Sequence, residues 1–285
     1  MLLSSIILIL LAYWILGTVL FFKQPSFIFN PTKNEPYTPA NIGLPYEKVL
    51  LRTPDRLILN AWFVPAHNAE ITILFCHGNG GNISYTLDTV NIFNELGYNT
   101  FVFDYRGYGT SQGTPTEQGT YIDAQTAYDW LIHTKGIHPE DIIIFGRSLG
   151  GSIAANLASQ VKAKGLIIES AFTSYADIGV KFYPYMPVRL FARYEFKTSE
   201  YLKKVDYPKL IIHSRTDEIV PFEFGLRLYE LYANEPKDFI EIFGSHNDGF
   251  LYSGQVYREG LSSWISSLTK QNKQQQSTAK LRIVS

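Results

Sequence analysis

Residues 141–160, which read DIIIFGRSLGGSIAANLASQ, decide the fold of this chain. An apolar run ends at Phe145, the turn sequence Gly146-Arg147-Ser148-Leu149-Gly150 follows, and an amphipathic segment begins directly after it. Strand, sharp turn and helix form the setting in which a G-x-S-x-G sequence exposes a nucleophilic serine. The positive end of the helix dipole would lie close to that serine. The alternative is an ordinary glycine-rich turn in which Ser148 only caps the helix.

Short apolar runs alternate with helical periodicity on both sides of this stretch. The runs predict strands at 49–52, 57–64, 71–76, 100–103, 141–145, 166–168, 209–212 and 239–242, of which the first two form an antiparallel pair. Amphipathic stretches predict helices at 84–96, 118–134, 149–160, 222–233 and 250–268. This alternation predicts an α/β domain over residues 46–269, with a mostly parallel sheet and helices on both faces. Ligands of such sheets bind beyond the carboxyl ends of the strands.

A serine hydroxyl is a weak nucleophile, so Ser148 needs a base, and the base needs an orienting acid. In this kind of sheet the three groups follow the chain order serine, acid, histidine, each after a strand. Of the six histidines, His246 follows the last predicted strand and is the predicted base. His213, at the end of strand 209–212, is its rival, although a packed position beneath the loop suits it better.

The predicted acid is Asp217, which follows the strand that ends near His213. Glu218 is adjacent, but it would point elsewhere if Asp217 faces the histidine. Glu169 follows the preceding strand and is a second rival, because some hydrolases carry the acid there. The sequence therefore favours Ser148, Asp217 and His246 as one catalytic group.

Two backbone N–H groups should bind the negative charge that develops on the substrate oxygen. Leu149, directly after the serine, is the first predicted donor. The second is Asn79, in the glycine-rich loop His77-Gly78-Asn79-Gly80-Gly81-Asn82 after strand 71–76. The competing interpretation is a phosphate-binding loop, but neither a G-K-[ST] ending nor a G-x-G-x-x-G sequence is present.

The combination of motifs resembles a known family. The loop at 77–82, the turn at 146–151, Asp217 and His246 occur in the family's order together with residues 104–111, Asp-Tyr-Arg-Gly-Tyr-Gly-Thr-Ser. Over residues 46–268 the chain is similar to the α/β-hydrolase domain-containing proteins of types 13 and 17 and their bacterial relatives. The resemblance implies an α/β-hydrolase fold with Ser148, Asp217 and His246 as its triad. Within residues 104–111, we expect Arg106 to bridge neighbouring loops rather than to take part in chemistry.

One departure from the family limits what the resemblance implies. Type 17 relatives resemble protein depalmitoylases with a cysteine-rich, lipidated amino terminus, whereas this chain has no cysteine before Cys76. Its first 22 residues hold no ionisable side chain, and 18 of them are apolar. Such a stretch reaches about 33 Å as a helix, enough to cross a hydrocarbon core of about 30 Å. We predict an uncleaved single-pass membrane anchor over residues 1–22, without assigning the side of the membrane. A cleaved signal peptide and a buried core helix are the alternatives.

Prolines mark the segment after the anchor. Five of them lie in residues 23–45, which therefore predict an extended linker without helix or central strand. At the other end, residues 270–285 carry four basic and no acidic side chains among glutamines and serines. They predict a disordered tail.

An aromatic insert separates two predicted strands at residues 171–205. It contains nine aromatic residues in 35 positions, namely Phe172, Tyr175, Phe182, Tyr183, Tyr185, Phe191, Tyr194, Phe196 and Tyr201. In this fold the position forms a short lid above the nucleophile, so the rings could line an apolar acyl or aryl pocket. They could equally pack the lid onto the core.

The charge balance excludes one class of partner. With 25 basic and 26 acidic side chains, the net charge is −1, so the chain lacks the surplus of positive charge that nucleic acid binding needs. The sequence predicts a membrane-anchored serine hydrolase of a small-molecule or acylated ester or thioester, with no metal or organic cofactor. The alternatives are a serine peptidase or amidase of the same fold and a non-catalytic membrane-anchored binding protein.

Overall fold

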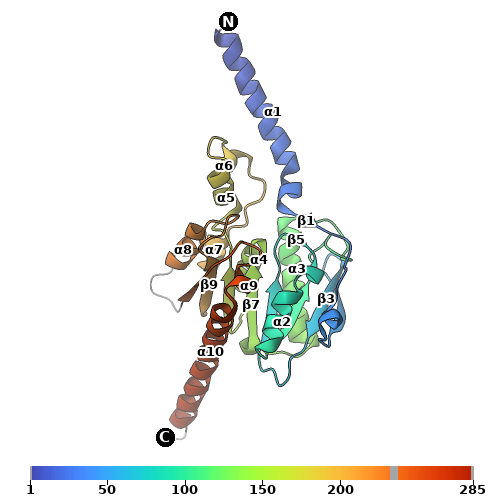
Figure 1. Ribbon diagram of the computed structural model, residues 1–285, viewed down its shortest axis with the longest axis vertical. Coiled ribbons are helices and arrows are strands. Elements are labelled where there is room, and N and C mark those ends of the chain that lie inside the picture. Colours follow the sequence, from blue (N-terminus) through green and yellow to red (C-terminus); the bar gives the residue numbers. More distant parts are fainter. Residues whose placement is uncertain (1, 232–236, 284–285) are drawn as a thin grey trace.

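The protein is known from a computed structural model that describes residues 2–231 and 237–283. A compact body carries a long helix at each end (Figure 1). Helix α1 (Leu2–Ile28) projects from one end of the body, and α10 (Gly254–Ile283) leaves it at the other. Two lid helices, α5 (Tyr175–Phe182) and α6 (Val188–Phe191), stand beside the lower part of α1.

The body is built on an eight-stranded sheet in the order β10-β9-β8-β7-β4-β6-β3-β2. Strands β2 (Glu47–Arg52) and β3 (Ile58–Val64) form the predicted antiparallel pair, and β3 is also antiparallel to β6. The other six are parallel and are listed here: β4 (Thr72–Cys76), β6 (Asn99–Phe103), β7 (Ile142–Arg147), β8 (Gly165–Glu169), β9 (Lys209–Ser214) and β10 (Lys237–Ile242). Their carboxyl ends therefore meet at one edge, which is where the candidate residues lie.

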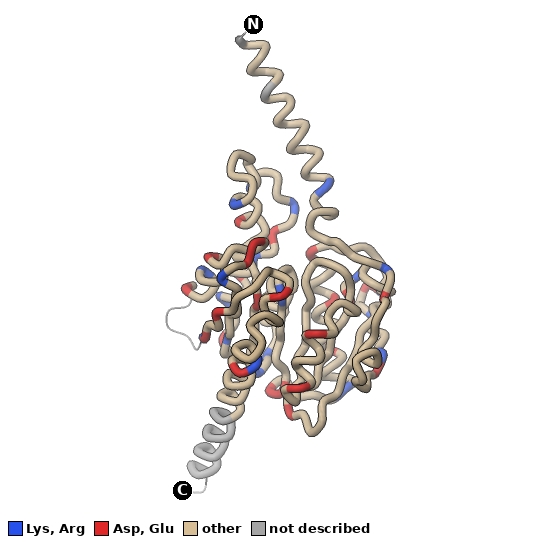
Figure 2. Tube along the Cα trace, in the orientation of Figure 1, with Lys and Arg blue, Asp and Glu red and all other residues tan. Residues whose placement is uncertain are grey.

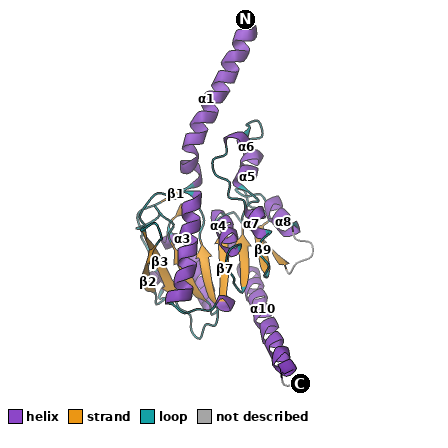
Figure 3. Cartoon of the chain, turned by 180° about the vertical axis from the view of Figure 1, so that it is seen from behind, coloured by secondary structure: helices purple, strands orange, loops and turns teal. Residues whose placement is uncertain are grey.

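Helices cover both faces of this sheet, which confirms the predicted architecture. Figure 3 shows α3 (Glu117–Asp129), α4 (Leu149–Ala158) and α7 (Thr198–Leu202) in front of the strands. Helix α8 (Phe222–Glu230) packs on the same face, whereas α2 (Leu87–Glu95) and α10 cover the other. Alternation along β4 explains the two cores, because Leu74 and Cys76 face the first layer while Ile73 and Phe75 face the second.

Helix α1 is apolar and long enough to cross a membrane, and little of it is buried. It has 27 residues, and so a length of about 40 Å. The predicted linker is wrong at its start, because the helix does not stop at residue 22 but continues through Pro25 to Ile28. Proline removes its own N–H from the helix, and its ring crowds the carbonyl four residues earlier, so it usually kinks or ends a helix. Its carbonyl still accepts a bond from the Phe29 N–H at 2.9 Å, and burial of Ile28 and Phe29 in the body holds this last turn in place.

The rest of the linker is attached to the body. Strand β1 (Asn30–Pro31) pairs in parallel with β5 (Gly80–Gly81), inside the glycine-rich loop. A 3₁₀ helix follows at Pro39–Ile42. Residues 30–45 therefore form part of the domain, whereas the prolines in the sequence suggest only a spacer.

The carboxyl-terminal segment also differs from the prediction. Short helix α9 (Gly249–Tyr252) leads into α10, which packs Tyr257, Leu261 and Trp264 onto the sheet. Helical backbone continues to Ile283, across most of the tail predicted as disordered at 270–285. Lysine, glutamine and alanine all favour helix, so a turn already fixed by packing can propagate through them. Residues 284 and 285 lie outside the described part of the chain.

Candidate active site

Ser148 lies in a strained turn between β7 and α4. Its φ of 56° and ψ of −122° fall where side chains other than glycine are rare. The turn is tight because Gly146 and Gly150 have no side chains. A Cβ atom at Gly146 would lie 2.2 Å from the Gly150 carbonyl oxygen, and one at Gly150 would lie 2.1 Å from that of Cys76. The Ser148 N–H donates to the Glu169 carbonyl at 2.8 Å, which fixes the turn to β8.

His246 connects Ser148 to Asp217. Its Nε2 lies 2.9 Å from Ser148 Oγ, and its Nδ1 lies 2.7 Å from Asp217 Oδ2. The other carboxylate oxygen of Asp217 accepts the N–H groups of Ile219 at 3.0 Å and Val220 at 2.7 Å. Three loops, after β7, β9 and β10, thus bring together the three residues that the sequence favours. Such an arrangement can move the serine proton to the imidazole while the carboxylate stabilises the resulting cation.

The rival histidine holds the aspartate loop instead of facing the serine. His213 is fully buried, and its Nε2 lies 2.7 Å from the Val220 carbonyl oxygen. Burial lowers its pKa, so the ring is neutral and donates this bond. Val220 in turn donates its N–H to Asp217, and His213 Nε2 itself lies 3.5 Å from Asp217 Oδ2. His213 is therefore a packed residue that positions the loop, in agreement with the sequence.

Both rival acids have other partners. Glu218 Oε2 accepts the backbone N–H of His246 at 3.1 Å. Glu169 is buried, where it accepts Arg147 Nε at 2.5 Å and the Tyr257 hydroxyl at 2.6 Å. Arg147 also lies over the Phe250 ring at 3.9 Å. This cluster was not predicted from the sequence, since its members come from β7, β8, α9 and the start of α10.

Two tyrosines of the 104–111 loop hold the glycine-rich loop against the nucleophile. The Tyr105 hydroxyl donates to the His77 carbonyl and the Tyr108 hydroxyl to the Asn79 carbonyl, both at 2.8 Å. The Asn30 N–H in β1 donates to that same Asn79 carbonyl at 3.0 Å. A Cβ atom at Gly78 would lie 3.7 Å from Ser148 Cβ, so the loop borders the serine directly. Residues 104–111 were singled out in the sequence, but the hydrogen-bond partners of the two tyrosines could be identified only from the structure.

A buried carboxyl supports the same loop. Asp104 Oδ1 accepts the Ile83 N–H at 2.9 Å, and burial raises the pKa of Asp104 to about 8. Burial lowers the pKa of His77 to about 4, so its ring is neutral and its 3.7 Å approach to Asp104 is not an ion pair at neutral pH. Arg106 bridges Asp123 and Asp55, each at 2.8 Å. Arg106 thus forms a bridge, as predicted, although one of its partners lies in the turn between β2 and β3 and the other in helix α3.

A cavity of about 870 Å³ opens in front of the serine. Ser148, His246, Asn79 and Leu149 line it, so the residues chosen from the sequence as oxyanion donors face the same space as the nucleophile. The lid contributes apolar wall through Phe172, Tyr175, Ile178, Phe182 and Tyr183. In the part of the chain that the structure describes, no group of three His, Cys, Asp or Glu side chains could hold a metal ion.

Comparison with known proteins agrees with this geometry. A family model described as serine aminopeptidase, S33, matches residues 67–197. The α/β-hydrolase domain-containing protein WAV2 of Arabidopsis thaliana is 35% identical over 248 residues, which cover 79% of this chain and 80% of that protein. The chain belongs to the α/β-hydrolase family. A Saccharomyces cerevisiae membrane protein, YNL320W, is 34% identical to this hydrolase over 230 residues, or 78% of its chain and 81% of the yeast protein.

Solved structures share the hydrolase fold. An esterase from Pyrococcus furiosus, Pf2001, superposes with a TM-score of 0.66 at 22% identity, covering 86% of the hydrolase and 97% of that chain. An α/β hydrolase from Vibrio vulnificus superposes with a TM-score of 0.63 at 24% identity, covering 81% and 82%. At such identities the likeness concerns the fold.

Proposed function

We propose that the protein is a serine hydrolase that cleaves an ester or thioester by acyl transfer to Ser148. The observation that carries this proposal is the chain of contacts from Ser148 Oγ through His246 to Asp217, at 2.9 and 2.7 Å. His246 takes the serine proton as Oγ attacks the carbonyl carbon, and then gives it to the leaving group. A water molecule, activated by the same histidine, releases the acyl group and restores the serine.

The backbone around the serine suits the charge that this reaction creates. Leu149 is the first residue of α4, and N–H groups in the first turn of a helix have no partner within the helix. With the Asn79 amide, it would bind the oxyanion of the tetrahedral intermediate. Three hydrogen bonds, from Tyr105, Tyr108 and Asn30, fix the Asn79 loop before substrate arrives. Donors held in this way need not reorganise during the reaction.

The hydrolase would act at a membrane, with α1 as its anchor. Figure 2 shows no charged residue along α1 until its lower end, where Lys23 is the first in the sequence. The helix is apolar and exposed, and the name of the yeast relative includes "membrane protein". Transfer of the apolar surface of such a helix from water into the membrane is favourable, so it would stabilise the anchored state.

A peptidase of the same fold is the second candidate, because the matching family model is described as a serine aminopeptidase. An aminopeptidase has to bind the positively charged amino terminus of its substrate. Among the described residues that line the cavity, Asp88 is the only carboxylate, and the lid side is apolar. This lining favours an acyl group over an amino-terminal peptide.

Labelling with a fluorophosphonate probe tests the proposal on the full chain. Wild type should form a stable adduct, and Ser148→Ala should not. The matched control is Ser152→Ala, which changes a buried serine four residues along the same helix and should label like wild type. Absence of labelling in wild type, beside a control hydrolase that labels, would leave the non-catalytic binding protein as the better description. Faster turnover of aminoacyl amides than of matched esters would favour the peptidase.

A further inference from the structure

A second cavity adjoins the catalytic one, between α1 and the lid. Its volume is about 400 Å³. From α1 it is lined by Gly17, Leu20, Gln24 and Phe27, and from the lid by Tyr175, Gly179, Tyr183, Met186, Val188, Phe191 and Ala192. Four of these residues, Phe27, Tyr175, Gly179 and Tyr183, also line the cavity of Ser148. The two cavities therefore adjoin at these four residues, and together we call them the groove between the surface of α1 and the nucleophile.

Specific contacts hold the lid against α1. Gln24 donates from Nε2 to the Phe191 carbonyl at 2.6 Å and accepts the Arg193 N–H at Oε1 at 2.7 Å. Gly17 gives room for the Phe191 ring, since a Cβ atom there would lie 2.6 Å from it. Because Gln24 already has partners on the lid, the one amide side chain among the described residues that line the cavity beside α1 presents little unsatisfied polarity.

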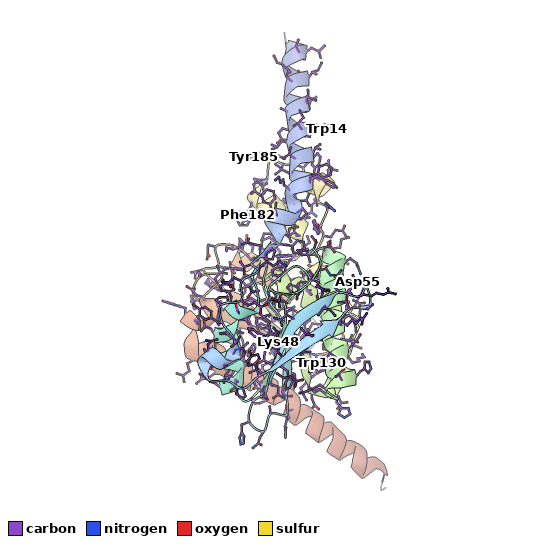
Figure 4. The ribbon with its side chains drawn as sticks, turned by 90° about the vertical axis from the view of Figure 1, so that its right-hand side faces the viewer. Trp14, Lys48, Asp55, Trp130, Phe182 and Tyr185 are labelled. Carbon is purple, nitrogen blue, oxygen red and sulfur yellow. The ribbon has the colours of Figure 1, made fainter. Side chains whose placement is uncertain are left out.

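The tip of the lid reaches well along the apolar helix. The Tyr13 hydroxyl donates to the Tyr185 carbonyl, and Figure 4 shows Tyr185 beside α1 near the level of Trp14. Tyr13 precedes Lys23, the first charge of the chain, by ten residues. At about 1.5 Å per residue, this places the tip about 15 Å from the charged end of the span. If Lys23 lies at the membrane surface, the tip enters the acyl layer of one leaflet.

The surface of the lid tip suits hydrocarbon. Tyr185 is 89% exposed, Leu190 82% and Tyr183 65%. Arg189, the charged residue between them, reaches back toward the body and pairs with Asp177 Oδ1 at 2.6 Å. Long basic side chains near an interface commonly extend in this way toward the polar region. Exposed apolar groups gathered in one patch indicate a membrane or partner contact. Because these groups lie beside the membrane anchor, we infer that they contact the membrane.

We propose that the substrate is a lipid ester of the leaflet around α1, whose acyl chain enters sideways through the groove between α1 and the lid. This inference rests on the proposed function and names the substrate class of the same site. The entrance lies at a depth where acyl chains are the surrounding solvent. A peptide backbone at that depth would leave N–H and C=O groups without partners. The ester carbonyl reaches Ser148, the bond to Oγ forms, and the C–O bond to the alcohol breaks as His246 protonates the departing oxygen. Water then completes hydrolysis to the fatty acid.

A bulky side chain in the outer groove tests the route. The variant Leu20→Trp fills the cavity beside α1 without altering a residue of the serine cavity. With the full chain reconstituted in vesicles, we expect at least a tenfold lower rate on a long-chain glycerolipid ester in the bilayer. The rate on a water-soluble acetate ester and the fluorophosphonate labelling should stay at wild-type values. The matched control is Val19→Trp, which adds the same side chain on the neighbouring, exposed position of α1 and should change neither rate.

The results separate failure of the route from failure of the enzyme. Equal rates of Leu20→Trp and wild type on the bilayer ester, with acetate ester turnover intact, would overturn the groove as the entrance. If wild type neither hydrolyses the acetate ester nor reacts with the fluorophosphonate probe, the proposed function itself is contradicted. If wild type cleaves a vesicle-bound S-acyl peptide at least tenfold faster than the lipid ester, the lipid substrate is overturned.

The depth of the lid tip is measurable because Cys76 is the only cysteine. It is buried, and burial raises its thiol pKa, so it should not react with a labelling reagent. A polarity-sensitive fluorophore on Leu190→Cys should shift its emission to the blue in vesicles and be quenched by lipids that carry a quencher on the acyl chain. The same label on Lys48→Cys, an exposed position of β2 on the body, should do neither. Water-like emission from residue 190 would overturn insertion of the lid.

Discussion

The sheet edge around Ser148 and the lid above it are built in opposite ways. At the edge, Asp217 and His246 are buried, and each polar atom of Asp217 has a hydrogen-bond partner from a loop tied to a strand. At the lid tip, Tyr185 and Leu190 are almost fully exposed. The hydrogen bonds at the edge hold the catalytic side chains in the geometry that proton transfer and bond breaking require. The lid presents surface, which suits recognition of a membrane-bound substrate.

The largest effect should come from the carboxylate at the edge. Replacement Asp217→Asn keeps the shape but removes the charge that stabilises protonated His246 and disturbs its tautomer, so kcat on a soluble ester should fall about 10⁴-fold. The matched variant Glu218→Gln retains an oxygen acceptor for the His246 N–H and should stay within about threefold of wild type. Steady-state kinetics on both variants decide this. A comparable loss in the two would contradict the assignment of Asp217 as the acid.

A smaller effect is expected on the pH dependence of the free energy of unfolding, through the buried carboxyl of Asp104. Folded protein keeps the Asp104 proton up to about pH 8, whereas the unfolded chain releases it near 3.8. Between these values the folded state binds more protons, so this carboxyl makes the free energy of unfolding fall as pH rises. Lowered pKa values of His77 and His213 act in the opposite direction, but only below about pH 6.5.

Between pH 6.5 and 8, Asp104 should therefore lower the free energy of unfolding by about 2 kcal/mol at most. Asp104→Asn still offers an oxygen to the Ile83 N–H and should flatten the slope over that range. Denaturant unfolding at pH 6.5 and 8 measures it. Identical slopes for wild type and variant would show that Asp104 does not hold its proton at neutral pH.

The hydroxyl that steadies the oxyanion loop should have a further, modest effect. Tyr108→Phe removes one of two bonds to the Asn79 carbonyl, while Asn30 keeps the other. Complete loss of an oxyanion donor costs about 10²- to 10³-fold, so loosening one should lower kcat roughly tenfold with little change in KM. Tyr128→Phe removes an equivalent hydroxyl bond, to the Lys162 carbonyl, away from the serine cavity. It should leave kcat unchanged, although both variants should lose about 1 kcal/mol of stability.

The smallest effect is expected for a substitution at the tip of the lid. Tyr185→Ser alters an exposed ring, so stability in detergent should change by less than about 0.5 kcal/mol. Turnover of a water-soluble ester should also stay at the wild-type value, as measured by kcat/KM. A fall in that value beyond about threefold would show that the tip also shapes the serine site, and the division between edge and lid would no longer hold.

Local sequence was enough to predict the edge of the sheet. Each of the three candidate residues follows the end of a strand by at most four positions, and parallel strands bring such positions to one edge. Ser148, Asp217 and His246 could thus be chosen without knowing any contact. Other buried partners could not, because Arg147, Glu169 and Tyr257 are brought together by packing between elements distant in sequence.

The lid and the linker were predictable only in outline. Composition indicated aromatic residues over the serine, but not that Tyr194 and Phe196 would be buried while Tyr185 would be exposed. That division depends on where α1 lies. Likewise, Pro25 indicated the end of a helix, and tertiary burial of the next turn overrode that local signal.

Pairing of β1 with β5 has a practical consequence for removing the anchor. A truncation at residue 46, where the alternating pattern begins, would take Ile28 and Phe29 out of the core, at about 1.5–3 kcal/mol for each buried side chain. It would also remove the Asn30 N–H from the Asn79 carbonyl and Glu35 from Asn60. A water-soluble form that keeps a complete oxyanion loop must therefore begin before Ile28, and so retain the end of the membrane helix.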